Sequence, residues 1–262
     1  AIGLIKNKMQ EHKGLRMNLI EFQEYEKLVL GKLQVSFYRT NHSIPDSFGI
    51  VIHTPEGVIV HSGDFKFDFT PTGPDANYQK MAELGQKGVL LLLSDSTNSE
   101  LAGFTKSEKI VASTIKDLFT KVKGRVIVAT FASNVHRVQQ IIEASVATNR
   151  KVATYGRSML KTIDVGTDMG YIKAPKGTIV DPKSVHRIPS EQVTLLTTGS
   201  QGEPLAALSR IAAGTHRQIK ILPGDTVIFS SSPIPGNQSG VGKMINMLFR
   251  RGANVIINSP LT

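Results

Sequence analysis

The chain of 262 residues contains no cysteine, and it has no long apolar run. Without cysteine, a disulfide framework and a metal site built on thiolates are both excluded. The longest apolar run is Val89–Leu93 with its flanks, far short of the roughly 20 residues that a transmembrane helix needs. We therefore expect neither a disulfide-stabilised protein nor one that spans a membrane.

A secretory leader, basic and then apolar, is also missing, so we expect a cytoplasmic protein. Because 40% of the residues are apolar, collagen-like and mostly disordered chains are excluded. The sequence starts at Ala1 inside an amphipathic pattern and ends at Thr262 just after an apolar strand. Both ends suggest a piece of a longer chain.

Charge is distributed unevenly along the chain, which has a net charge of +10. Residues 1–104 carry 10 basic and 12 acidic residues, whereas residues 105–262 carry 21 basic and 9 acidic ones. An excess of surface charge often serves solubility alone. An asymmetry this strong nevertheless favours a polyanionic partner for the second part: RNA, DNA or an anionic membrane. No basic amphipathic helix stands out there, which weakens the membrane alternative.

The pattern of apolar residues changes at the same place as the charge. The first part predicts a short helix and then β structure, with a hairpin turn at Thr54–Gly57 and a buried last strand at 89–93. In the second part strands alternate with helices over short connections, which predicts a mostly parallel sheet covered on both faces. The expected strands are 33–37, 48–53, 58–61, 89–93, 125–130, 151–154, 193–197, 226–229 and 254–257. The expected helices are 2–10, 77–84, 107–121, 135–147, 158–169, 204–213 and 240–250. The fold class is thus α/β, with a β-rich domain at 1–104 and a doubly wound domain at 105–262.

Three connections from strand to helix in the second domain are rich in hydroxyl and glycine residues: Thr130–Asn134, Thr197–Pro204 and Ser230–Asn237. Ligands of open parallel sheets bind beyond the carboxyl ends of the strands, where helix N-termini point. Ser and Asn also cap helices in proteins that bind nothing. Three such loops at one edge of a basic domain favour a groove that binds phosphate groups. Gly156–Ser158 follows a fourth strand and adds a cation, Arg157.

Two residues at strand exits of the first domain are candidate metal ligands: His42 and Asp64. An imidazole and a carboxylate suit Zn²⁺ or Mn²⁺, and a bridging carboxylate suits a two-metal site. A single His or Asp at a strand end also often caps a turn. The chain has no His-x-His pair, so alone it cannot supply a full two-metal shell.

Six segments resemble, in order, motifs of the ribonuclease J family, in the β-CASP branch of the metallo-β-lactamase superfamily. The resemblance covers essentially the whole chain. The segments are Thr40–Ser47, His61–Asp68, Leu93–Glu100, Phe131–Arg137, Thr198–Pro204 and Ser230–Asn237. The resemblance implies that residues 1–104 are the C-terminal portion of an incomplete metallo-β-lactamase αββα sandwich. It implies that residues 105–262 are a β-CASP domain.

The family resemblance also implies roles for particular residues. His42 and Asp64 match metal-binding motifs, with Asp64 bridging two divalent ions, expected to be Zn, with Mn or Mg as alternatives. Asp64 and Asp95 are the expected catalytic carboxylates. Residues of the strand-exit loops are expected to hold RNA: Ser133, Asn134, Val135, His136, Arg137, Arg157, Ser158, Ser200, Ser231 and Ser232.

The implied function is metal-dependent 5′-to-3′ exonuclease and endonuclease action in bacterial rRNA processing and mRNA decay. The expected partners are RNA and, in the intact protein, further copies of it or a paralogous ribonuclease subunit. The family's HxHxDH motif and its C-terminal histidine motifs are not in this sequence, so we expect the isolated chain to be inactive. A non-catalytic RNA-binding module is the alternative. A nucleotide-using enzyme would need a phosphate-binding fingerprint that the sequence lacks.

Overall fold

The structure is a computed structural model that describes residues 2–10, 12, 14, 16–100, 102–234 and 236–257. The chain divides into two compact units, Ala1–Val111 (unit 1) and Ala112–Thr262 (unit 2). Their junction lies inside helix α3 (Glu108–Lys121), a few residues after the boundary that the sequence predicts. Among the described residues, no helix is long and apolar enough to cross a bilayer.

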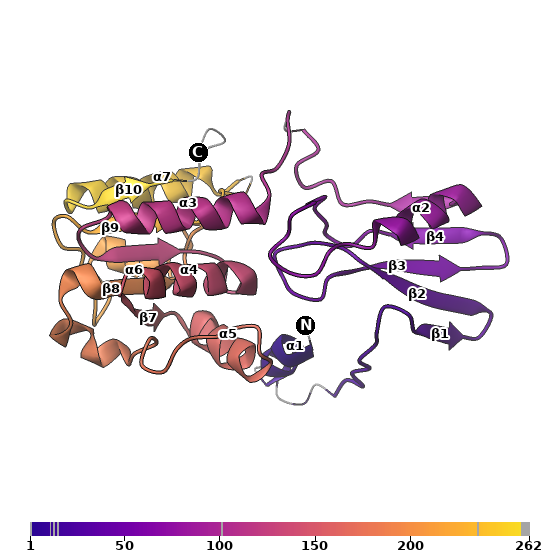
Figure 1. Cartoon of the computed structure of the whole chain (residues 1–262), viewed down its shortest axis with the longest axis horizontal. Helices are drawn as coiled ribbons and strands as arrows, with labels where there is room; N and C mark the ends of the chain where they lie inside the picture. The colour runs from indigo at the N-terminus through magenta and orange to yellow at the C-terminus, as the bar shows by residue number, and fades with distance from the viewer. Residues whose placement is uncertain are drawn as a thin grey trace. The chain divides into compact units, whose positions relative to one another are not determined.

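Unit 1 holds a five-stranded sheet in the order β1-β2-β3-β4-β5 (Figure 1). Its strands are antiparallel except for the parallel pair β4–β5. The elements are α1 (Ile2–Met9), β1 (Lys27–Leu30), β2 (Leu33–Arg39), β3 (Phe48–His53), β4 (Val58–His61), α2 (Tyr78–Lys87) and β5 (Leu91–Leu93). The hairpin between β3 and β4 is confirmed, and its Thr54 hydroxyl accepts from the N–H groups of Glu56 and Gly57.

The small core of unit 1 forms where α2 packs on the sheet. Leu84 of α2 joins Tyr38, Val51 and Val60, one residue from each of β2, β3 and β4. Alternate side chains of a strand point to the same face, so these positions follow from the period-two pattern of the sequence. Gly49 faces Tyr38, and a Cβ at this position would lie 2.1 Å from the Cζ atom of the Tyr38 ring. The glycine therefore makes room for the ring.

The prediction that the strand at 89–93 is buried is wrong. Leu91, Leu92 and Leu93 of β5 are 47%, 59% and 46% exposed. β5 is the last strand in the order of its sheet, paired with β4 on one side. An apolar run specifies a strand that can be buried, but burial also needs a covering layer, and the described residues provide none over β5.

Unit 2 is a five-stranded, fully parallel sheet in the order β10-β9-β6-β8-β7. Helices connect its strands, so the predicted doubly wound α/β architecture is confirmed (Figure 1). Its strands are β6 (Val126–Ala129), β7 (Lys151–Tyr155), β8 (Val193–Thr197), β9 (Thr226–Phe229) and β10 (Asn254–Ile256). Its helices are α3, α4 (Val135–Ala147), α5 (Arg157–Asp168), η1 (Pro182–Arg187), η2 (Ser190–Gln192), α6 (Ala207–Ala213) and α7 (Gln238–Arg250).

Both faces of the unit 2 sheet are covered. Every residue of the central strands β6, β8 and β9 is buried, and successive side chains of a strand point to opposite faces. On one face, Leu208 of α6 and Met244 of α7 pack on Ile127 of β6 and Leu195 of β8. This rigid sheet fixes where the strand exits lie.

Candidate functional site

The carboxyl ends of the parallel strands of unit 2 lie along one edge of the sheet. Segments 130–137, 156–158, 197–204 and 230–237 follow β6, β7, β8 and β9 there, and we call them the carboxyl edge. These four strands are neighbours in the sheet. The expectation that the hydroxyl-rich loops share one edge is therefore confirmed.

Gln201 binds two of these loops together. Its side chain is buried at 5% exposure. Its Nε2 donates to the Ser232 carbonyl (3.0 Å) and lies 3.5 Å from Ser231 Oγ, while its Oε1 accepts from the N–H of Ile234 (2.7 Å) and from Asn237 Nδ2 (3.3 Å). One amide thus holds the loop after β8 against the loop after β9.

Arg137 makes a second link, from α4 to the exit of β9. Its guanidinium donates through Nη1 to the carbonyl (2.9 Å) and hydroxyl (2.7 Å) of Ser230, and through Nε to Gln140 Oε1 (3.0 Å). Arg137 is only 7% exposed. The Asn134 side chain caps the same helix by accepting from the Arg137 N–H (3.0 Å). Both residues shape the carboxyl edge.

Two glycines allow the loops to approach one another closely. Gly156 has φ of +107°, and a Cβ there would lie 2.5 Å from Thr198 Oγ1 in the loop after β8. Gly202 has φ of +76°, and a Cβ there would lie 2.6 Å from the carbonyl carbon of Gly240 in α7. Left-handed conformations of this kind suit glycine. Together with the hydrogen bonds of Gln201 and Arg137, these close approaches make the four segments one closely packed surface.

The residues predicted to bind RNA divide into exposed and buried groups. Ser133, Arg157, Ser158 and Ser232 are exposed, and Asn134, His136 and Ser231 are half-buried. Val135, Arg137 and Ser200 are buried, so their side chains shape the edge rather than line its surface. Whether any of these residues contacts RNA stays a prediction.

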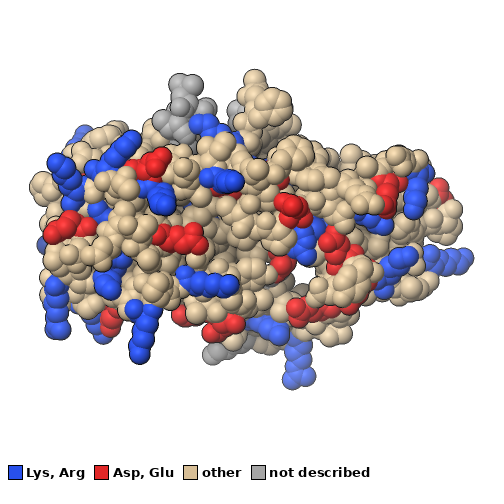
Figure 2. Space-filling view, in the orientation of Figure 1, with Lys and Arg blue, Asp and Glu red and all other residues tan. Residues whose placement is uncertain are grey.

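Helix ends and charge also suit anions at this edge. Within the described part of the chain, no side chain caps the N-termini of α5 and α7. The first N–H groups of these helices are therefore not used by a cap, and they carry the positive end of the helix dipole. Arg157 begins α5 and makes no ion pair or side-chain hydrogen bond within the described chain. Figure 2 shows Lys and Arg side chains spread widely over the visible face of unit 2, with fewer acidic side chains between them.

His42 and Asp64 face one another in unit 1, as the metal-site hypothesis requires. His42 follows β2 and Asp64 follows β4, and their Nε2 and Oδ2 atoms are 3.7 Å apart. Ser43 Oγ lies 3.2 Å from the same His42 nitrogen. The side chain of Asp64 is 73% exposed and that of His42 33%. Both ligand-type groups are therefore accessible from solvent.

The backbone around these residues is tied down. Lys66 N–H donates to the Asn41 carbonyl (2.8 Å), which pairs the loop of His42 with the loop of Asp64. Gly63 between β4 and Asp64 has φ of +60°, and a Cβ there would lie 3.0 Å from the Phe48 carbonyl oxygen. The turn that carries Asp64 therefore depends on a glycine.

Asp95 lies beside the same turn. Its N–H donates to Ser62 Oγ (2.9 Å), directly after β4. Its carboxylate accepts from the hydroxyl (2.6 Å) and the N–H (2.9 Å) of Thr97. The hydrogen bond from the Thr97 hydroxyl is the main cause that holds the pKa of Asp95 below its ordinary value, and the N–H groups of Thr97, Phe65 and Ser96 lower it further. Asp95 is therefore held as a carboxylate next to the Asp64 turn.

His42 and Asp64 fit part of a divalent metal site, because one imidazole nitrogen and one carboxylate are suitable ligands. Within the described ranges, no group of three or more His, Asp or Glu side chains could hold a metal ion. The expectation from the sequence that the chain alone cannot supply a full two-metal shell stays a prediction.

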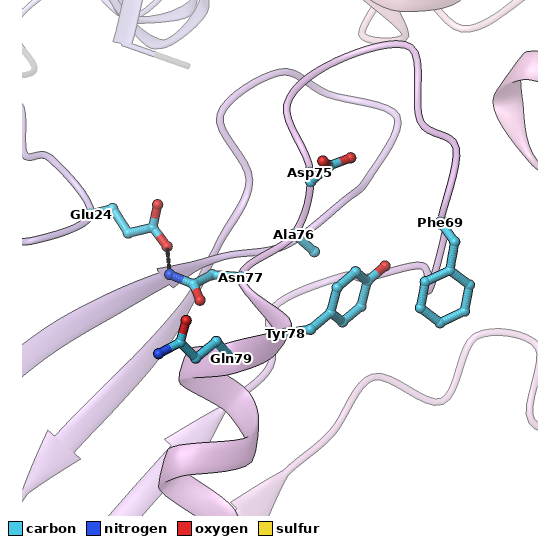
Figure 3. A pocket seen from close by; sticks show the side chains of 7 residues that line it. All are labelled: Glu24, Phe69, Asp75, Ala76, Asn77, Tyr78 and Gln79. Carbon is cyan, nitrogen blue, oxygen red and sulfur yellow. Dashed lines mark hydrogen bonds between the residues drawn. The ribbon is translucent and has the colours of Figure 1, made fainter.

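A pocket of about 540 Å³ opens in unit 1 at the start of α2 (Figure 3). Most of its polar groups already bond within the chain: Asn77 Nδ2 donates to Glu24 Oε1 (2.6 Å), and the Tyr78 hydroxyl donates to the Asp68 carbonyl (3.1 Å). The Asp68 carboxylate accepts in turn from the N–H of Glu108 (2.8 Å). Burial acts to raise the pKa of Asp68, but this hydrogen bond and others hold it below its ordinary value. These hydrogen bonds therefore hold the segment that follows Asp64 in place.

Sequence reasoning did not single out Gln201, Ser62 or Asp68. All three lie inside segments that it did single out, but nothing in their spacing shows that one amide joins two loops or that one carboxylate binds the start of α3. Contacts between residues far apart in sequence carry no local signal.

Comparison with known proteins identifies the family. Residues 123–248 match the family model described as "Ribonuclease J, beta-CASP domain". Over 257 residues the chain is 52% identical to Ribonuclease J 1 of Streptococcus pyogenes, covering 98% of this chain and 46% of that protein. It is 50% identical over 259 residues to Ribonuclease J of Synechocystis sp., covering 98% of this chain and 40% of that one. The chain thus spans less than half the length of these relatives.

A solved structure shares the fold. The crystal structure of a protein of unknown function from Enterococcus faecalis V583 aligns with a TM-score of 0.68 over 98% of this chain and 60% of that chain. Its identity of 12% makes this a likeness of fold alone. The fold and the sequence similarity agree with the motifs described above. The chain belongs to the ribonuclease J family, and residues 123–248 carry the β-CASP domain of that family.

Proposed function

We propose that this protein is part of a metal-dependent ribonuclease, in which unit 2 binds the sugar–phosphate backbone of RNA and unit 1 contributes ligands to the metal centre. The observation that carries the proposal is the carboxyl edge, where cross-bonded loops present exposed hydroxyls, Arg157 and two uncapped helix N-termini. Backbone contacts of this kind carry little sequence information. We therefore expect weak sequence preference.

The metal centre would include His42 and Asp64. Divalent cations, Zn²⁺ in the first place and Mn²⁺ or Mg²⁺ as alternatives, would supply positive charge that stabilises a phosphodiester under attack by water. The exposed carboxylate of Asp64 would be one of the groups that hold these cations. Asp95, whose pKa is held below its ordinary value, is a carboxylate at neutral pH and would accept a hydrogen bond from a reacting group. Hydrolysis would leave a 5′-phosphate on the retained product.

The salt dependence of RNA binding tests the backbone-reading edge. Fluorescence anisotropy of a labelled single-stranded RNA of mixed sequence, measured between 50 and 200 mM salt, should show a steep loss of affinity, because each neutralised phosphate contributes about −0.7 to the slope of log K against log salt. An RNA of equal length and different sequence is the control and should bind similarly. An affinity that stays flat with salt would contradict the proposal.

A chimera tests the catalytic part. The matching segment of the Streptococcus pyogenes relative is replaced by this chain, which is 52% identical to it. RNA cleavage by the chimera should require divalent metal, and His42→Ala and Asp64→Ala should each abolish cleavage while RNA affinity stays within about twofold. His53→Ala serves as the matched control, because His53 lies in β3 and its ring is 3.4 Å from Ser36 Oγ. Unchanged cleavage in both ligand variants would overturn the metal assignment.

RNA binding without catalysis is the second candidate function for the chain by itself. It is favoured by the finding that the described residues hold no cluster of three metal ligands. The purified chain should bind RNA and should not cleave it, with or without Zn²⁺ or Mn²⁺. Metal-dependent cleavage by the chain alone would refute this.

The wider role follows from the same resemblance. We propose that the protein acts in the bacterial cytoplasm as a 5′-to-3′ exonuclease and endonuclease in rRNA processing and mRNA decay. We further propose that it assembles with copies of itself or with a paralogous subunit. Separation by size of the native assembly from cell extract tests the last point.

A further inference from the structure

A second cavity lies at the other end of the unit 2 strands. It has a volume of about 530 Å³, within the range of small-molecule sites, and residues at the starts of β6 and β8 line it together with η1 and the segment before β9. We call it the amino-edge pocket. Because the strands are parallel and four to five residues long, the pocket is separated from the carboxyl edge by roughly 13–17 Å of strand at about 3.3 Å per residue.

The inner wall of the amino-edge pocket is apolar. It is formed by Val185 and Ile188 of the η1 region, Val193 of β8, and Ile219 and Leu222 before β9. Val185, Val193 and Ile219 are buried, whereas Leu222 is 49% exposed. Apolar side chains in this wall can pack against the apolar part of a ligand and exclude water from the contact.

The rim of the pocket is polar, and the described residues that line the pocket include no carboxylate. Lys183, His186 and Gln218 line it. Their side chains are exposed and make no hydrogen bond or ion pair with any described residue. Three side chains with hydrogen-bond donors thus line the opening without a partner among the described residues.

Arg125 adds a buried cation to the lining. It is 8% exposed, and its Nε and Nη2 atoms donate to the Asp225 carboxylate and to the Lys220 carbonyl (2.7 Å). Its Nη1 atom makes no hydrogen bond within the described chain. The guanidinium is therefore fixed in place by Asp225 while part of its donor capacity remains unused, which is how a binding site holds an arginine for an anion.

We propose that the amino-edge pocket binds a small phosphorylated molecule with a planar apolar body, a nucleoside monophosphate being the class that matches both halves of the site. Lys183, His186 and Gln218 at the rim, together with the unused Nη1 donor of Arg125, whose charge Asp225 balances, call for an anion. The apolar wall and the volume call for a body of the size of a nucleobase. This site is independent of the RNA-binding function proposed for the carboxyl edge.

Isothermal titration calorimetry of the chain at constant ionic strength tests the proposal with three probes: AMP, inorganic phosphate and adenosine. AMP should bind at least about tenfold more tightly than either half alone, because it fills both parts of the pocket. Lys183→Ala and His186→Ala should each weaken AMP binding by about tenfold, the usual effect of losing one charge-assisted hydrogen bond. Lys116→Ala, which removes an exposed lysine of α3, is the control and should leave AMP binding unchanged.

A blocking variant keeps the test independent of charge. Leu222→Trp should fill the half-exposed mouth of the pocket and abolish AMP binding, while the circular dichroism spectrum and the RNA affinity stay as in the unmodified chain. Absence of AMP binding at millimolar concentration would overturn the proposal. So would AMP binding that is weakened by Arg157→Ala at the carboxyl edge and unaffected by Lys183→Ala, a result that would leave the RNA-binding proposal intact.

Discussion

Substitutions of Arg137 and Arg157 at the carboxyl edge should have different effects, the first on the stability of the fold and the second on RNA affinity. Arg137 is buried and donates three hydrogen bonds to Ser230 and Gln140. Arg157 is exposed and makes no side-chain bond within the described chain. Arg137→Met and Arg157→Met remove the same group and keep a similar length of apolar stem, so that each variant is the control for the other.

The expected magnitudes follow from these contacts. In Arg137→Met, the buried carbonyl and hydroxyl of Ser230 and the Gln140 oxygen lose their donors, which should lower the free energy of unfolding by about 2–4 kcal/mol. In Arg157→Met, the free energy of unfolding should change by less than about 0.5 kcal/mol. RNA affinity should fall in Arg157→Met, and the slope of its salt dependence should decrease by about 0.7, the share of one phosphate contact on a single strand.

Urea unfolding followed by circular dichroism gives the first quantity, and RNA anisotropy at several salt concentrations gives the second. Equal stability of Arg137→Met and the unmodified chain would refute the account of Arg137 as the link between α4 and the exit of β9. An unchanged salt slope in Arg157→Met would remove Arg157 from the phosphate-binding surface.

Three further variants probe single contacts. Thr97→Val should raise the pKa of Asp95, which NMR titration of its carboxyl carbon measures. The folded-state pKa lies below its ordinary value, so the carboxylate stabilises the fold above the ordinary pKa, and this stabilisation is lost as the pH falls through the lowered pKa. In the variant the loss should occur at higher pH, and an unshifted titration would contradict this. Gly202→Ala should destabilise the fold by about 2–4 kcal/mol, because Gly202 has a left-handed φ and the new Cβ would lie 2.6 Å from backbone. Gly236→Ala, at a positive φ with open space around it, should destabilise the fold by only about 1 kcal/mol. Equal shifts of the thermal unfolding midpoint in the two variants would argue against a close approach of the loops. Asp225→Ala leaves a buried guanidinium without its carboxylate and should destabilise by about 3–5 kcal/mol in urea unfolding, and a loss below 1 kcal/mol would count against that pair.

The regular elements of the fold were largely predictable from the sequence. The strands at Phe48–His53, Val193–Thr197 and Thr226–Phe229 and the helix at Val135–Ala147 have the bounds that periodicity predicts. Strand β1 (Lys27–Leu30) was missed, because four residues with only one polar position show no clear alternation. Helix α6 begins at Ala207 rather than at 204.

The candidate site was predictable only in part. Parallel strands bring their exits to one edge, so the common position of the hydroxyl-rich loops follows from topology. His42 and Asp64 approach one another because β2 and β4 lie on either side of β3, run in the same direction and end at the same edge. The bonds that make these loops one surface depend on Gln201 and Arg137, whose partners are about 30 and 90 residues away in sequence. The amino-edge pocket draws on segments from Arg125 to Leu222, and only folding brings them together.

The exposed edge of strand β5 bears on self-association of the chain at high protein concentration. In the described chain the strand has one neighbour, β4, and its three leucines are about half exposed. The unpaired backbone N–H and C=O groups of an edge strand, flanked by exposed apolar side chains, can pair with a strand of another molecule. Light scattering should therefore detect reversible self-association that grows with protein concentration, and a lysine in place of Leu92 should suppress it.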